Sequence, residues 1–134
     1  MFFKKKIAEL NKTNKEIKKI VVIDDDVSMH DVFKVYFGEK YETTCYETLN
    51  PNDFKKNLSL PDLFVIDINL QERNGFDIGQ VIREIISKDI PIIYISLDKD
   101  YKNSHDKIGD ENTFFMNKPL RRADLGLALH FMMK

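Results

Sequence analysis

Residues 19–26 read KIVVIDDD, in which four apolar, mostly β-branched residues run directly into three adjacent carboxylates. A short continuous apolar run of this kind is typical of a strand that is buried on both faces. Carboxylates held so close together repel one another and raise one another's pKa unless a positive group lies among them. The stretch therefore predicts a buried strand that ends at a cation site or a phosphate-handling site, or, more simply, at carboxylates that point into water.

The composition is that of a single folded domain. The chain has 134 residues, of which 43% are hydrophobic and 32% charged, and this length is sufficient for a core without disulfides. Its one cysteine, Cys45, cannot form an internal disulfide, which favours a reducing, cytoplasmic location. No apolar run approaches the length of a membrane span, and the basic N-terminus lacks the apolar stretch of a signal peptide.

The charge is unevenly distributed along the chain. Residues 1–19 carry seven lysines against two glutamates, a net charge of +5, whereas residues 20–134 carry fourteen basic and twenty acidic residues, a net charge of -6. We expect residues 1–18 to be a basic N-terminal extension and residues 19–134 to be the folded domain. Apolar residues near helical spacing predict a short helix in the extension, either solvated or in contact with an anionic membrane or a partner.

Strand-like and helix-like patterns alternate from residue 20 onward. The predicted strands are 20–23, 41–46, 63–66, 92–95 and 114–116. The predicted helices are 29–37, one that begins at Asn50-Pro51, 76–86 and 120–133. Residues 98–112 are polar, so a helix in this segment is predicted to be short, displaced or mobile. The alternation predicts an α/β protein of three layers, with helices on both faces of a doubly wound parallel sheet of five strands.

Polar side chains follow four of these strands at the point where each strand ends: Asp24 and Asp25, then Asp67, Ser96 and Lys118. In open α/β sheets, ligands bind outside the carboxyl ends of the strands. Two or three carboxylates suit Mg²⁺, and a carboxylate beside the metal can act as a nucleophile toward phosphorus. A hydroxyl and an ammonium would hold the transferred phosphoryl oxygens, so the set predicts phosphoryl-transfer chemistry.

From about residue 19 to its end, the sequence resembles the receiver domains of two-component response regulators, which have a flavodoxin-like (βα)5 fold. The resemblance rests on four motifs in order: IVVIDDD with the acidic pair Asp24-Asp25, DLFVIDINLQERNG with Asp67 and Gly75, IPIIYIS with Ser96, and FFMNKP with Lys118-Pro119. It implies a phosphoacceptor at Asp67 that is supplied by a histidine kinase or phosphotransfer protein. Such a domain is not an enzyme with turnover, beyond Mg²⁺-dependent self-phosphorylation and autodephosphorylation.

The resemblance also assigns roles to the surrounding residues. Asp25 and Asp67 would ligate Mg²⁺ directly, Asp24 would assist through water, and the Asn69 backbone carbonyl would complete the protein's ligands. Ser96 and Lys118 would contact phosphoryl oxygens, and Phe115 would be the switch aromatic behind Ser96. Asn69 and Asp98 occupy the two positions that tune the lifetime of the acyl phosphate in this family.

Some of these residues have simpler interpretations. Asp26 is expected to be a solvated carboxylate, and Phe115 could equally fill the core. The three histidines, His30, His105 and His130, have no evident catalytic partner and are expected to be structural or exposed.

The sequence departs from the family pattern at four places. Leu70-Gln71 replaces the usual Met-Pro, Leu97 replaces an alanine, Glu111-Asn112 replaces Gly-Ala, and residues 98–112 lack a clear fourth-helix pattern. A bulky Leu97 could hinder access to the phosphate. These departures leave open a pseudo-receiver, a binding module that works without phosphorylation.

We expect the output to run through protein contacts with a downstream target that the sequence does not name. The acidic core offers no basic groove for nucleic acid. In the closing helix, Leu127 and Phe131 would form a docking or dimer surface if exposed. The domain could stand alone or be part of a longer protein such as a hybrid kinase.

The stretch Asp24-x-Asp26-Val27 also resembles the opening motif of phosphatases of the haloacid-dehalogenase type, which is a rival interpretation from another class of protein. That interpretation leaves Asp67, Gly75 and Lys118 without a role.

Overall fold

The apolar runs form one parallel sheet. The computed structural model describes residues 17–50, 60–71, 74–97 and 112–133. Its strands are β1 (Lys18–Ile23), β2 (Tyr41–Tyr46), β3 (Leu63–Asp67), β4 (Ile92–Ser96) and β5 (Thr113–Asn117). All neighbours in the order β2-β1-β3-β4-β5 are parallel, so the chain winds outward in one direction from β1 to β2 and in the other from β3 to β5. The direction of winding reverses between β1 and β3, which is where such sheets bind ligands.

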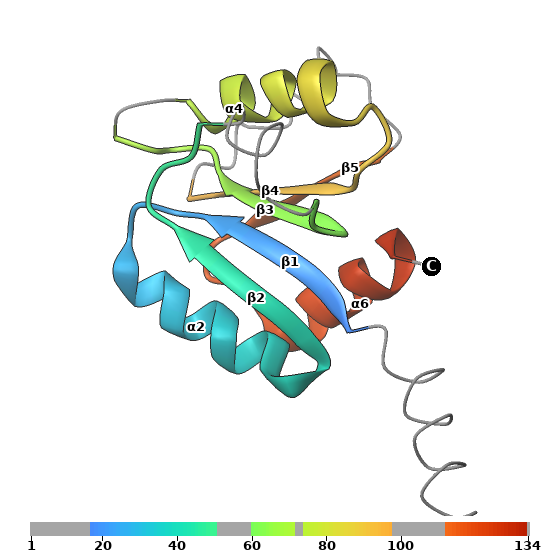
Figure 1. Ribbon diagram of the computed structural model, residues 1–134. Coiled ribbons are helices and arrows are strands. Elements are labelled where there is room, and N and C mark those ends of the chain that lie inside the picture. Colours follow the sequence, from blue (N-terminus) through green and yellow to red (C-terminus); the bar gives the residue numbers. More distant parts are fainter. Residues whose placement is uncertain (1–16, 51–59, 72–73, 98–111, 134) are drawn as a thin grey trace, which may run out of the picture.

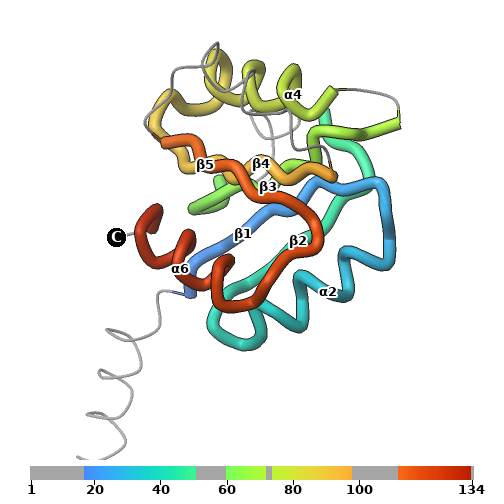
Figure 2. The backbone as a smooth tube through the Cα atoms, turned by 180° about the vertical axis from the view of Figure 1, so that it is seen from behind, coloured from blue at the N-terminus to red at the C-terminus, as the bar shows by residue number. Residues whose placement is uncertain are grey.

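The described helices cover both faces of the sheet. They are α2 (Val27–Phe37), followed by the 3₁₀ turn η1 (Gly38–Lys40); α4 (Gly75–Val81), which continues as the π-helical turn η2 (Ile82–Ile86); and α6 (Arg122–Met132). Figures 1 and 2 show α2 and α6 against one face and α4 against the other. The predicted α/β fold of three layers with a flavodoxin-like parallel sheet is confirmed. The helix expected from Asn50-Pro51 and the polar segment 98–111 lie outside the described residues.

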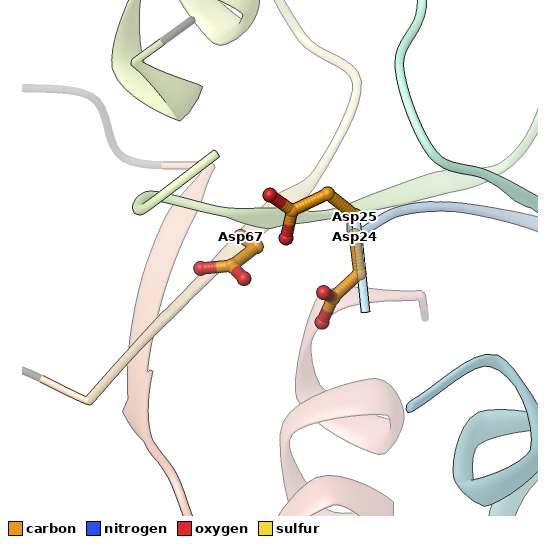
Figure 3. A group of neighbouring side chains, drawn as sticks. All are labelled: Asp24, Asp25 and Asp67. Atoms are coloured by element: carbon orange, nitrogen blue, oxygen red, sulfur yellow. The ribbon is translucent and has the colours of Figure 1, made fainter. Parts of the chain in front are cut away.

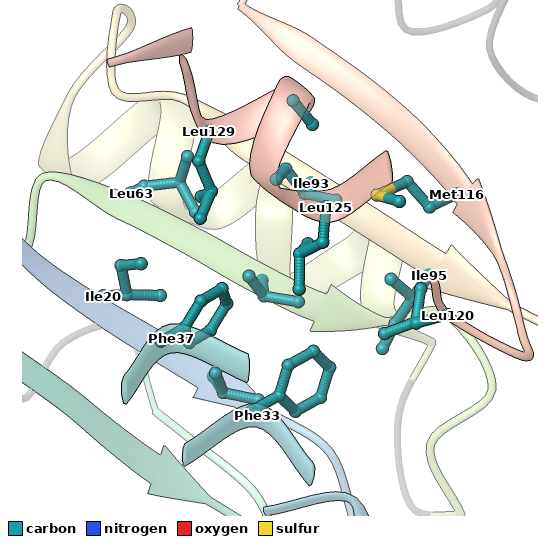
Figure 4. Packing of buried hydrophobic residues seen from close by; sticks show 13 residues of the cluster. Ile20, Phe33, Phe37, Leu63, Ile93, Ile95, Met116, Leu120, Leu125 and Leu129 are labelled. Atoms are coloured by element: carbon teal, nitrogen blue, oxygen red, sulfur yellow. The ribbon is translucent and has the colours of Figure 1, made fainter. Parts of the chain in front are cut away.

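The core has two parts because successive residues of a strand face opposite sides of the sheet. On one side, α2 and α6 pack on β1, β3 and β4 through residues such as Phe33, Phe37 and Leu125 (Figure 4). On the other side, Ile78 and Ile82 of the α4–η2 helix pack on the same strands. Every residue of β3 and β4 is buried, which explains why both strands are continuous apolar runs until they reach the site.

Local sequence signals set both ends of α2. The exposed Asp26 carboxylate accepts hydrogen bonds from the backbone N–H of Ser28 at 3.0 Å and from its hydroxyl at 2.6 Å, so Asp26 caps the helix. The expected solvated carboxylate is therefore exposed but also structural. At the other end, Gly38 has φ of 56°, a left-handed conformation that favours glycine, and it terminates α2 as predicted.

Candidate functional site

Three carboxylates meet at the point where the winding of the sheet reverses. Ile23 of β1 lies opposite Ile66 of β3, so Asp24 follows β1 beside the last residue of β3, Asp67. Asp24, Asp25 and Asp67 each offer an oxygen atom within 4.8 Å of the others, and Figure 3 shows the three side chains gathered around one space. The strand-end residues that the sequence placed on separate strands are thus brought together.

Lys118 brings a positive charge to the two buried carboxylates. Its Nζ atom lies 3.1 Å from Asp67 Oδ2 and 3.3 Å from Asp24 Oδ2. The lysine reaches them because β5 pairs with β4 up to Ser96, and the Lys118 N–H then donates to the Ser96 carbonyl at 2.8 Å. The Lys118-Pro119 peptide bond that follows is cis. The arrangement holds two carboxylates against a single ammonium group.

The electrostatics of this group follow from burial and charge. Burial raises the pKa of the Asp24 carboxyl, and the neighbouring Asp67 raises it further, against the backbone hydrogen bond from Asp26 and the charge of Lys118. Burial alone would lower the pKa of the Lys118 ammonium, but its hydrogen bond to Asp67 and the charge of Asp24 outweigh this effect and raise the pKa. With three carboxylates around one ammonium group, the described cluster keeps an excess of negative charge.

Each of the three carboxylates is oriented by a backbone N–H group. Asp24 Oδ1 accepts from Asp26 at 2.9 Å, Asp67 Oδ1 accepts from Asn69 at 3.0 Å, and Asp25 Oδ2 accepts from Gln71 at 2.9 Å. The second oxygen of Asp24, Oδ2, is buried and has an ion pair with Lys118 but no hydrogen bond. An all-oxygen set with an incompletely satisfied buried carboxylate fits a hard dication such as Mg²⁺.

Ser96 lies beside this cluster and is 1% exposed. Its hydroxyl donates to the side-chain oxygen of Asn69 at 3.3 Å, which ties the end of β4 to the loop after β3. The next residue, Leu97, is 72% exposed, so its side chain projects mainly into solvent. Asp98 lies outside the described residues.

Gly75 lets helix α4 approach the end of β3 closely. A Cβ atom at this position would lie 2.8 Å from the carbonyl carbon of Asp67 and 2.9 Å from Cα of Ile68, and it would collide with the Asp67 carbonyl oxygen. The Gly75 N–H donates to the Ile68 carbonyl at 2.9 Å, and the side chain of Asn74 caps the helix through the N–H of Phe76. The presence of glycine at position 75 therefore has a steric reason in this structure.

Phe115 is half-buried in an aromatic cluster on the α4 side of the sheet. Its ring stacks on Tyr94 at 5.4 Å between centroids and lies 5.9 Å from the ring of Phe76. Phe115 therefore packs against the core through residues of β4 and α4, and the role of Phe115 as a switch stays a prediction. Nothing in the spacing of Phe76 or Tyr94 singled these two residues out.

Sequence reasoning missed two further contacts of the acidic residues. His30, expected to be structural or exposed and without a catalytic partner, places its Nε2 atom 2.6 Å from the Asp24 backbone carbonyl, a structural contact that the sequence did not specify. Gln71, noted only as a departure from the family pattern, contributes its backbone N–H to Asp25. For His30, its place in the first turn of α2, three residues after Val27, was an available signal, because this turn lies next to the end of β1.

Fold and site together define a flavodoxin-like α/β domain with an acidic cluster and a lysine at the switch point of its sheet. The model of the response regulator receiver domain family matches residues 20–130. The chain belongs to this family and is thus the receiver domain of a two-component response regulator, a signalling domain and not a classical enzyme. The acidic cluster is consistent with the metal site that is typical of such domains.

Individual relatives agree with this assignment. The transcriptional regulatory protein KdpE of Staphylococcus aureus is 26% identical over 108 residues, a match that covers 80% of this chain and 46% of KdpE. The chain thus spans about half the length of this curated relative.

Two solved receiver structures share the fold. A receiver domain from Bacteroides fragilis has a TM-score of 0.75 at 16% identity, over 89% of this chain and 98% of its own. A CheY-like receiver protein from Methanospirillum hungatei has a TM-score of 0.73 at 20% identity, over 88% and 94%.

The remaining expectations concern surfaces. Leu127 and Phe131 of α6 are 58% and 66% exposed, as a docking or dimer surface would require. Within the part of the chain that the structure describes, no helix is both long and apolar enough to cross a bilayer.

Proposed function

We propose that Asp67 is the phosphoacceptor and that it is phosphorylated in a Mg²⁺-dependent reaction. The proposal rests on the surroundings of the Asp67 carboxylate. Oxygen atoms of Asp24 and Asp25 lie within 4.8 Å of it, and the Lys118 Nζ atom lies 3.1 Å from its Oδ2 atom. A nucleophilic carboxylate, an acidic cation site and a fixed positive charge are the parts that phosphoryl transfer to an aspartate needs.

In the proposed reaction, an Asp67 carboxylate oxygen attacks the phosphorus atom of a phosphohistidine. The new P–O bond makes an acyl phosphate, and the broken P–N bond returns its electron pair to the imidazole of the donor. The N–H of Asn69 holds Asp67 Oδ1, which leaves Oδ2, the oxygen beside Lys118, to react. Lys118 would then move from the carboxylate to a phosphoryl oxygen, where its charge stabilises the transferred group.

Asp25 and Asp67 would hold Mg²⁺ directly, with the Asn69 carbonyl as a third protein ligand and Asp24 acting through water. When bound, the metal ion supplies the positive charge that neutralises the phosphoryl oxygens as they approach three carboxylates. The buried Asp24 Oδ2, which has no hydrogen bond, supports a role for Asp24 in the polar surroundings of the ion.

Ser96 and Phe115 would transmit the modification to the surface. Once phosphorylated, Asp67 would offer the Ser96 hydroxyl an acceptor better than its 3.3 Å contact with Asn69. Phe115 would respond by changing its packing on Tyr94, and contacts with a downstream protein would follow from that change. We propose a histidine kinase or a phosphotransfer protein as the donor. We also propose that the basic segment before β1 is an extension appended to the domain, although β1 begins at Lys18, one residue before the predicted boundary.

Intact mass spectrometry tests the proposal. Incubation with acetyl phosphate and Mg²⁺ should add one phosphoryl group to the wild type, with none added in EDTA or in Asp67→Asn. Asp77→Asn, which removes an exposed aspartate from the first turn of α4, is the matched control and should be labelled normally. A phosphoryl group that still appears on Asp67→Asn would refute the assignment.

A phosphorylation-independent pseudo-receiver is the alternative that this experiment addresses. The exposure of Leu97 supports an open path to Asp67, contrary to the hindrance considered from sequence. The phosphatase alternative is wrong, because the chain belongs to the receiver family and the Asp26 carboxylate that it requires caps α2.

A further inference from the structure

The backbone N–H of Gln71 forms a hydrogen bond that joins two separate parts of the acidic site. It donates to Asp25 Oδ2 at 2.9 Å, across 46 positions of sequence. Gln71 lies in the loop after β3, and its own side chain is exposed to solvent. The contact is therefore made by the backbone and does not depend on the glutamine side chain.

The same loop carries other parts of the site. Its Ile68 N–H donates to the Ile95 carbonyl at 2.9 Å, and its Asn69 N–H donates to Asp67 Oδ1 at 3.0 Å. These bonds anchor the beginning of the loop to β4 and to the phosphoacceptor. The Gln71 bond anchors the loop four residues after Asp67 to the end of β1, and so fixes Asp25 relative to Asp67 and the Asn69 carbonyl.

We propose that the Gln71 N–H is a positioning group that holds Asp25 ready for Mg²⁺ and thereby sets the affinity of the site. The inference rests on the proposed metal site. A carboxylate that ligates Mg²⁺ through one oxygen can keep a hydrogen bond on the other, and here Oδ2 is bonded while Oδ1 is left for the ion. Hydrogen bonds to metal-ligating groups typically contribute 10- to 100-fold to metal affinity.

The departure of this sequence from its family gives the bond its significance. Proline, the residue usual at this position, has no backbone N–H and cannot make the bond. Gln71 replaces the rigid proline ring by a residue with a backbone N–H. In this chain a hydrogen bond from that N–H orients Asp25, where in other members the proline ring could keep the loop rigid. The loss of proline makes the loop less rigid, and the Gln71 hydrogen bond compensates for this loss.

Three substitutions separate the N–H group from the stiffness of the loop. Gln71→Ala and Gln71→Gly keep the N–H, whereas Gln71→Pro removes it. Isothermal titration calorimetry with MgCl₂ should give similar affinities for the wild type and the alanine and glycine variants, and an affinity roughly tenfold lower for Gln71→Pro. If loop stiffness controlled the affinity, glycine would bind Mg²⁺ most weakly and proline most tightly, and that order would overturn the inference.

A second measurement needs neither Mg²⁺ nor a proline variant. Amide hydrogen exchange of Gln71, followed by NMR in EDTA, should be roughly tenfold slower in the wild type than in Asp25→Ala, because a bond to a carboxylate protects the amide. Equal exchange rates would overturn the inference even if Gln71→Pro failed to fold. Equal Mg²⁺ affinities for proline and alanine variants would overturn this inference alone, whereas a wild type that binds no Mg²⁺ would overturn the proposed metal site as well.

Discussion

The excess negative charge at the strand ends leads to a sharp prediction: Asp24→Asn stabilises the protein when Mg²⁺ is absent. The Asp24 side chain is fully buried, and it shares one ammonium group, that of Lys118, with Asp67. Neutralising Asp24 leaves the Lys118 ammonium paired with the Asp67 carboxylate alone. An asparagine has nearly the same shape, and its side-chain oxygen can still accept the N–H that Asp24 Oδ1 accepts now.

The sign follows from the direction of the pKa shift. The pKa of Asp24 is raised above its ordinary value of 3.8, first by burial and then by Asp67, so the folded state holds this proton more tightly than the unfolded chain. The contribution of Asp24 to stability is therefore greatest below pH 3.8, and it is lost as the pH rises through the raised pKa. Lys118 keeps its ion pair with Asp67 in this variant, so no buried charge is left unpaired. The relief of like-charge repulsion between the two carboxylates should therefore stabilise the folded state by on the order of 1 kcal/mol, roughly 3–5 °C for a domain of this size.

Urea denaturation followed by far-UV circular dichroism measures the effect. In EDTA, the advantage of Asp24→Asn should be absent near pH 4 and should develop as the pH rises toward 8. With Mg²⁺ at a hundred times its dissociation constant, the wild type should gain about 2.7 kcal/mol. The variant should gain less, so that the difference between the two shrinks or reverses.

Asp31→Asn, an exposed substitution on α2, is the matched control and should change stability by less than about 0.5 kcal/mol. An Asp24→Asn protein that is less stable than the wild type in EDTA at neutral pH would refute the electrostatic account. So would one that retains the full stabilisation by Mg²⁺.

Three further substitutions probe how the elements position the site. Gly75→Ala should lower the free energy of unfolding by roughly 1–3 kcal/mol and reduce phosphorylation, because its Cβ would displace the Asp67 backbone; normal labelling would contradict this. Gly126 lies in α6, and a Cβ atom added there has open space around it, so Gly126→Ala should instead raise the free energy of unfolding by about 0.5–1 kcal/mol. A lower free energy of unfolding would show that the added methyl group clashes with its surroundings. Asp26→Ala should lower the melting temperature without affecting labelling of Asp67, since it removes only the cap of α2. Hydrogen bonds from Ser28 lower the pKa of Asp26, so the difference from the wild type should vanish as the pH falls through that pKa, and a difference independent of pH would count against the cap.

The strands and the residues at their ends were predictable because a strand buried on both faces needs an uninterrupted apolar run. Such a run stops abruptly at the first residue that serves the site, as Ile66 gives way to Asp67 and Ile95 to Ser96. Parallel strands present these ends at one edge, so residues on separate strands could be assigned to one cluster before any distance was known.

Contacts made by the backbone were not predictable in the same way. The Gln71 N–H bond to Asp25 depends on the path of a loop, and no side-chain pattern marks it. The packing of Phe115 on Tyr94 likewise depends on which residues face each other across β4 and β5. The cap at Asp26 was accessible, because an aspartate directly before an apolar helical pattern is a strong start signal, but the surrounding run of carboxylates masked it.

The central claim is that Asp67 receives the phosphoryl group, and its direct test locates the modification. After incubation with acetyl phosphate and Mg²⁺, reduction with borohydride converts a phosphorylated aspartate to homoserine, which peptide mass spectrometry assigns to one position. We predict homoserine at residue 67 and aspartate retained at 24 and 25. Homoserine at either of those two positions, or no conversion where a control receiver domain is converted, would contradict the proposed function.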